Sequence, residues 1–173
     1  MALGNSFEDG QAGGQDLLKL FADLGYTDSP PPASRDRVAS VVQELWSRSS
    51  TGEPHPAVVG FFSEVMPESS FHGNILCLWG LEQMRSDQDQ VAPVCNIAPG
   101  SGLFAFAEWT GESDGDAWCY DIEHEVIRCI PVSCGYEDAD QTRLSSYGVF
   151  PYFQHLAGYL RIEAADRGWF SNE

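Results

Sequence analysis

The hydrophobic periodicity of this chain changes from helical to strand-like after His72, and that change constrains the fold more than any other feature. Before it, apolar residues recur at the spacing of amphipathic helices, as in the stripe from Val38 to Trp46. After it, short apolar runs bounded by turn residues are typical of strands. A last helical pattern closes the chain. Helices, then strands, then a helix predict an α+β fold, with a mainly antiparallel sheet of four to six strands flanked by N-terminal helices and a C-terminal helix.

The expected elements follow from these patterns and from the positions of proline and glycine. The predicted helices are Asp16–Leu24, Ser34–Arg48, Pro56–Met66 and Val149–Asp166, with one further helical turn at Leu81–Arg85. The predicted strands are Asn74–Trp79, Val91–Ile97, Leu103–Trp109, Asp116–Ile122 and Val126–Val132. Gly135–Ser146 is predicted to be a loop. Because residues 1–15 are polar and rich in glycine, we expect a flexible tail there, followed by a single domain over residues 16–173.

Negative charge is concentrated in the region of the predicted strands. The chain has 173 residues and a formal net charge of -17, and residues 51–140 hold 16 acidic residues against two basic ones. Such a surface repels nucleic acid and speeds the encounter with a basic protein. We therefore expect a folded acidic surface that binds a partner, although charges of this kind can also serve only to keep a protein soluble. The candidate partner-binding residues are Glu112, Asp114, Asp116, Asp121, Glu123, Glu125, Glu137, Asp138 and Asp140.

Signatures of catalysis are missing from the sequence. It contains no GxGxxG after a strand, no GxxxxGK[ST], no GxSxG and no HExxH. The five cysteines form no CxxC pair and lie mostly in apolar runs, so we expect reduced thiols and no metal site or cofactor. His124 lies between Glu123 and Glu125, in a turn predicted to be solvated. Trp79 and Trp118 lie in apolar strands, and this favours core positions over a ligand cleft.

Several motifs, taken in order, resemble the SUKH superfamily of Smi/Knr-type proteins. They are the apolar pair Phe61-Phe62, the strand and turn Ile75–Met84, the run Leu103–Glu108, the segment Gly115–Asp121 and the late segment Val149–Leu156. The resemblance covers about residues 56–164. Two of the family's motifs differ, with Pro54–Val58 in place of LPxx[FY] and Pro67–Ser70 in place of NGG. The chain therefore resembles a divergent member.

This resemblance implies a SUKH-like domain and a role as a bacterial immunity protein. Members of the superfamily bind a toxin, often a nuclease, and block it in the cytoplasm of the producing cell. The charge fits that role, since nucleases tend to be basic. We expect a cytoplasmic protein that occludes a basic cognate toxin and binds neither nucleic acid nor membrane. Two alternatives stay open: a small hydrolase or metal-dependent phosphoesterase using Asp114, Asp116 and Asp121, and a regulatory interaction scaffold of the Smi/Knr type.

Overall fold

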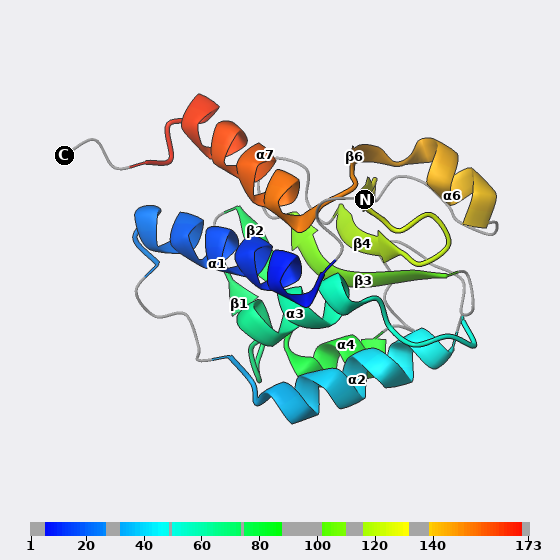
Figure 1. The fold of residues 1–173 in the computed structure, drawn as a ribbon. Helices are drawn as coiled ribbons and strands as arrows, with labels where there is room; N and C mark the ends of the chain where they lie inside the picture. The colour runs from blue at the N-terminus through cyan, green and yellow to red at the C-terminus, as the bar shows by residue number, and fades with distance from the viewer. Residues whose placement is uncertain are drawn as a thin grey trace.

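A computed structural model describes residues 6–26, 32–48, 50–73, 75–87, 102–109, 116–131 and 139–170 of the chain. The helices are α1 (Phe7–Asp23), α2 (Arg35–Ser47), α3 (Pro56–Val65), α4 (Leu81–Asp87), α6 (Ala139–Ser145) and α7 (Phe153–Asp166). The strands are β1 (Phe71–His72), β2 (Leu76–Leu78), β3 (Leu103–Trp109), β4 (Ala117–Asp121), β5 (Val126–Ile130) and β6 (Tyr147–Phe150). Figure 1 shows α1 and α3 in front of the sheet, α2 and α4 below them, and α6 apart from the other helices.

The described strands form one six-stranded antiparallel sheet in which each strand pairs with its sequence neighbour, in the order β1-β2-β3-β4-β5-β6. The predicted fold class is therefore confirmed. The β4–β5 hairpin has continuous register from Ala117↔Ile130 to Asp121↔Val126, and its turn at residues 122–125 includes the predicted turn at 123–125 and one residue, Ile122, predicted in the strand. The predicted strand Val91–Ile97 lies outside the described residues.

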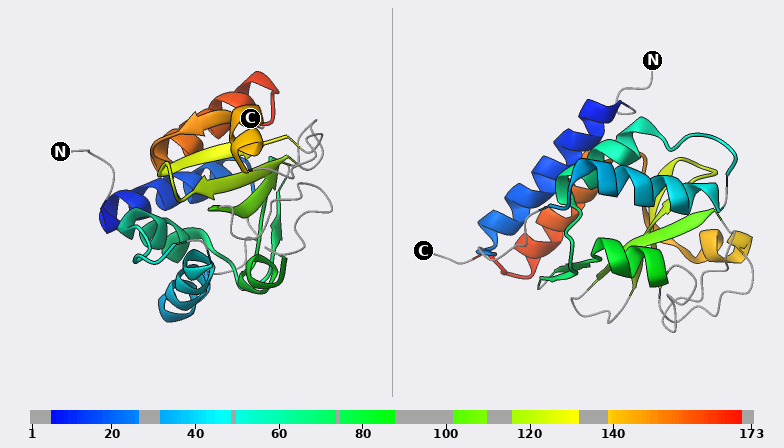
Figure 2. Two further views of the ribbon diagram at one scale, coloured as in Figure 1. Left: turned by 90° about the vertical axis from the view of Figure 1, so that its right-hand side faces the viewer. Right: turned by 90° about the horizontal axis from the view of Figure 1, so that it is seen from below.

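One core joins the helices to the sheet. Trp79 and Trp118 are both buried in it, as predicted. Phe61 of α3 stacks on Phe153 of α7 with ring centroids 4.0 Å apart, and the ring of Phe153 in turn stacks on Tyr120 of β4. Figure 2 shows these helices gathered on one side of the sheet, away from α6. No helix among the described residues is long and apolar enough to cross a membrane.

The expectation of a flexible tail is wrong for residues 7–15, because α1 begins at Phe7. A capping box starts the helix: Ser6 accepts a hydrogen bond from the backbone N–H of Asp9, whose carboxylate accepts one from the N–H of Ser6. Gly10 then packs against the backbone of α3, where a Cβ atom would lie 1.9 Å from the carbonyl oxygen of Ala57. The glycines thus allow two helices to approach closely, and the domain begins before residue 16.

The C-terminal part of the chain also differs from its prediction. Val149 and Phe150, expected in the last helix, lie in β6, and α7 begins only at Phe153. Pro151 explains the difference, since the residue before a proline is disfavoured in helical conformation. The expected loop Gly135–Ser146 contains α6, and the sheet has an additional short strand, β1. These corrections leave β6, instead of a helix, at the end of the sheet.

Candidate functional site

The candidate site is a surface made by the tip of the β4–β5 hairpin, helix α6 and strand β6. An ion pair of 3.1 Å from Arg143 of α6 to Glu123 joins the first two elements. Arg128 of β5 donates to the hydroxyl of Ser146, 3.2 Å away, just before β6. We call this the hairpin–α6–β6 surface, and its exposed acidic and large apolar side chains are Glu123, Glu125, Asp140, Leu144, Tyr147 and Val149.

A buried charge network supports this surface from below. Its centre is Asp121, the last residue of β4, which is fully buried. One carboxylate oxygen of Asp121 accepts hydrogen bonds from Nε of Arg128 at 2.8 Å and Nε of Arg143 at 3.0 Å. The other accepts from the backbone N–H groups of Glu123 and His124, at 3.2 and 3.3 Å. One carboxylate therefore fixes the hairpin turn, β5 and α6 relative to each other.

Asp121 is consequently not the surface charge that we predicted. Burial alone would raise the pKa of Asp121, but hydrogen bonds from Arg128 and Arg143 and the charge of Arg143 outweigh burial and hold that pKa below its ordinary value. The carboxylate stays ionised and is committed to its two arginines. His124 also contacts Asp121, with Nδ1 3.0 Å from a carboxylate oxygen, instead of pairing with the glutamates beside it in sequence.

Asp116 is buried as well and is the second correction to the predicted site. Its carboxylate accepts a hydrogen bond from the hydroxyl of Tyr147, and this bond ties β6 to the start of β4. Burial, followed by the bond to Asp116, raises the pKa of the Tyr147 hydroxyl far above its ordinary value, so that the hydroxyl stays protonated. Since Asp116 and Asp121 flank opposite ends of β4, roughly 16 Å apart in an extended strand, they form no catalytic carboxylate pair.

Three of the predicted acidic residues do face solvent. Glu123 and Asp140 keep 66% and 85% of their side-chain surface exposed although both contact Arg143. Glu125 is exposed with a backbone φ of +53°, in the left-handed region that glycine and asparagine usually occupy. A side chain at such a position costs about 1 kcal/mol. No hydrogen bond or ion pair within the described residues offsets that cost, so Glu125 is a candidate for a role outside the fold.

The structure adds apolar side chains that our sequence analysis missed. Leu144, Tyr147 and Val149 expose 78%, 38% and 46% of their surface, and most large apolar side chains of the described residues are buried. Asp140 and Leu144 are four residues apart in α6 and therefore share one helical face. The sequence analysis missed this group because it placed Leu144 and Tyr147 outside any helix or strand and Val149 in a helix, whereas the structure has them in α6 and β6.

The remaining predicted acidic residues, Glu112, Asp114, Glu137 and Asp138, lie outside the described residues. Within the described ranges, no group of three or more His, Cys, Asp or Glu side chains could hold a metal ion. Cys77, Cys119 and Cys129 are buried free thiols, and the other two cysteines lie outside those ranges.

His72 of β1 and Cys77 of β2 form a second polar contact, and the pKa of the thiol indicates a structural role for it. The sulfur lies 3.2 Å from Nδ1 of His72. Burial, together with the charge of Glu108, raises the pKa of the Cys77 thiol to about 11. A catalytic cysteine needs the opposite shift, because the thiolate is the nucleophile. The pair therefore lacks the activation of a cysteine hydrolase.

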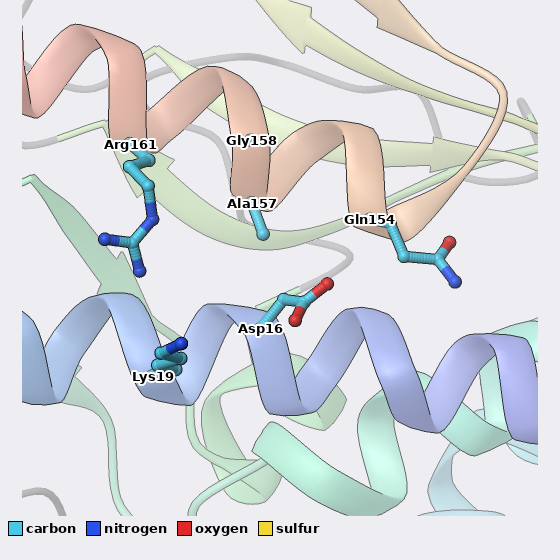
Figure 3. Close-up of a pocket in the computed structure, with 6 residues that line it drawn as sticks. All are labelled: Asp16, Lys19, Gln154, Ala157, Gly158 and Arg161. Carbon is cyan, nitrogen blue, oxygen red and sulfur yellow. The ribbon is translucent and has the colours of Figure 1, made fainter.

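A second candidate binding site is an open groove between α1 and α7. It has a volume of about 200 Å³ and is lined by Asp16, Lys19, Gln154, Ala157, Gly158 and Arg161. Figure 3 shows Arg161 reaching from α7 toward α1 and Asp16 pointing from α1 toward α7. Arg161 is already paired with Asp23 at 2.9 Å. The groove is smaller than common ligand pockets and has little apolar lining, so it gives weaker evidence of binding than the hairpin–α6–β6 surface.

Compared with known proteins, the chain matches no protein-family profile, no curated protein sequence and no solved structure.

Proposed function

We propose that this chain is a SUKH-type immunity protein that binds a basic cognate toxin through the hairpin–α6–β6 surface and neutralises it by occlusion. The observation that carries the proposal is that exposed carboxylates and exposed apolar side chains lie on elements that the Asp121 network holds together. Stable interfaces combine an apolar centre with a polar rim, and here Leu144, Tyr147 and Val149 supply the first. Glu123, Glu125 and Asp140 supply the second.

The negative charge of this protein would speed the formation of the proposed complex. The protein carries a formal net charge of -17, so a basic toxin is attracted before contact and like-charged proteins are repelled. A nuclease needs a basic surface to hold phosphates. A bound acidic protein would cover that surface and exclude nucleic acid without any catalysis. The proposal places this protein in the cytoplasm of the cell that makes the toxin, where its thiols stay reduced.

The test uses the product of the gene next to the one that encodes this chain. That product is expressed from an inducible promoter, with and without this protein, and growth is measured. Protection by the wild-type chain is expected. With both proteins purified, E123K/E125K should slow association at low salt by about tenfold and change dissociation little, because rim charges act mainly on the on-rate.

The matched control is D36K/D166K, which makes the same change of net charge elsewhere on the protein. Asp36 lies in the first turn of α2 and Asp166 is the last residue of α7. In Figure 1 the C-terminal end of α7 is far from α6. The control should alter the on-rate much less than E123K/E125K. Equal effects of both variants would mean that only net charge matters, and absence of protection by the wild-type chain would refute the immunity role.

A further inference from the structure

The outer edge of β6 is open in the described part of the protein. β6 pairs with β5 through Ile127↔Phe150 and Cys129↔Tyr147 and is the last strand of the sheet. The views in Figure 2 show β6 at the margin of the sheet, continuing from α6. Alternate N–H and C=O groups of an edge strand point away from the sheet and can pair with another chain.

This edge lacks the charged side chains that commonly block such pairing, although a β-bulge interrupts its pairing with β5 and Gly148 within it has a φ of +57°. Proteins protect edges with very short strands, charged side chains, β-bulges or proline within the strand. β1, at the other end of the sheet, has only two residues, one of them the exposed His72. β6 has four residues, YGVF, without charge, and its exposed side chains are Tyr147 and Val149.

The edge is also held rigidly, which lowers the entropy cost of binding. The hydroxyl of Tyr147 bonds to buried Asp116. The ring of Phe150 stacks on Trp118 and lies against Tyr159 of α7, with centroids 6.0 and 5.2 Å apart. Both ends of β6 are therefore fixed to the core, and its outer backbone groups are positioned before a partner arrives.

The negative charge of this protein favours one kind of chain at the edge of β6 over another. A second copy of this chain would bring the exposed carboxylates Glu123, Glu125 and Asp140 near an identical set, in a protein of net charge -17. Like charges across an interface oppose association. An extended segment with alternating apolar and basic side chains meets no such repulsion, because its two faces can contact the apolar group and the carboxylates.

We propose that β6 binds an extended basic segment of the partner protein as an added seventh strand. Backbone hydrogen bonds to the outward-facing groups of β6 would supply affinity, and contacts with Leu144 and Val149 would supply specificity. The identity of the partner rests on the proposed function, whereas the chemistry of the segment follows from the edge and its charges.

The experiment uses the full chain and synthetic peptides, without any toxin. The probe is an eight-residue peptide of alternating lysine and valine, and its controls are a glutamate–valine peptide and a lysine–valine peptide interrupted by proline. Backbone amide NMR shifts and hydrogen exchange locate binding. We expect shifts and increased protection at Tyr147–Phe150 with the first peptide only, and affinity that falls as salt rises.

Two variants test the mode of binding. V149P removes a backbone donor from the edge and should weaken the peptide about tenfold, whereas V149T should leave its affinity close to that of the wild type. If V149P fails to fold, L144S/V149S keeps every backbone group and should also weaken the peptide severalfold. Retained near-ultraviolet circular dichroism confirms that each variant tested is folded.

Several results would overturn the proposal: no binding of the lysine–valine peptide at millimolar concentration, shifts confined to residues away from β6, equal binding of the glutamate peptide, or a self-associated dimer that V149P dissociates. These outcomes are independent of growth protection. Protection with no peptide bound at β6 would reject the added strand and keep the immunity role. Peptide binding at β6 without protection would do the reverse.

Discussion

Close packing of α1 on α3 through glycine yields the sharpest prediction about stability. A Cβ atom at Gly60 would lie 2.1 Å from the carbonyl oxygen of Phe7 and 3.2 Å from the backbone nitrogen of Gln11. Backbone atoms cannot rotate away as a side chain can, so G60A must push the two helices apart by more than an ångström. Overpacking of this kind costs about 1–3 kcal/mol and often more when backbone moves. The better helix propensity of alanine returns only about 1 kcal/mol.

A matched substitution in α7 isolates the packing effect. Gly158 lies in the interior of α7, is exposed, and has nothing within 4 Å of the position of an added Cβ. G158A should therefore stabilise the protein by about 0.5–1 kcal/mol, through helix propensity alone. The same chemical change thus has opposite signs at two helical sites.

Urea unfolding followed by tryptophan fluorescence measures both free energies of unfolding. The pair G10A and G60A adds a further check, because a single separation of α1 from α3 relieves both clashes. The double variant should lose less stability than the sum of the two single losses. The account of helix packing would be refuted if G60A proved as stable as G158A.

Other predictions concern the charge network, the hairpin tip, the thiols and the core. D121N should cost about 3–5 kcal/mol, because it removes the buried charge that pairs with the largely buried side chains of Arg128 and Arg143. The pKa of Asp121 is lowered in the folded state, so its contribution to the free energy of unfolding is complete above about pH 4 and is lost as pH falls through the folded pKa. The stabilities of wild type and D121N should therefore converge in acid when unfolding is measured against pH. E125G should raise stability by about 1 kcal/mol in urea while it slows association with the partner, and a loss of stability would contradict the cost assigned to φ of +53°. All five cysteines should react with a thiol reagent after denaturation without reductant, with Cys77 protected until the protein unfolds; a count of three would reveal a disulfide. W118A should lose about 3–5 kcal/mol in the same urea assay, and a loss below 1 kcal/mol would show that the indole is not core.

Hydrophobic periodicity predicted most of the fold because it reports burial directly. The strand Leu103–Trp109 lies where the sequence predicts it, and the hairpin turn at 122–125 differs from its predicted position by one residue. Glycine in α1 was misread for a physical reason: its low helix propensity is a local property, whereas its value here lies in contact with α3, some 50 residues away. A single sequence shows the local cost of a glycine and conceals the distant contact that offsets it.

The candidate site was predicted only in part, because exposure of a carboxylate depends on which base reaches it. Asp121 and Glu123 are both acidic residues at the end of the same strand and are alike in sequence. Arg143, 22 residues beyond Asp121, donates hydrogen bonds to the buried carboxylate of Asp121 but leaves most of the Glu123 side chain in solvent. Tyr147 separates Asp116 from the surface in a similar way. Charge density alone therefore located the region but could not divide its residues into supporting and exposed groups.

That division gives the acidic region two distinct physical roles. A buried carboxylate such as Asp121 is effective only while paired, and it gives the hairpin tip a fixed position relative to α6. An exposed carboxylate such as Glu125 adds almost nothing to folding and occupies a backbone conformation that opposes it. A surface built only for solubility has no need to fix its charges beside an open strand edge or to accept a strained residue at the tip. The joint presence of the buried support, the strained Glu125 and the uncharged edge of β6 therefore supports the proposal that this surface binds a partner.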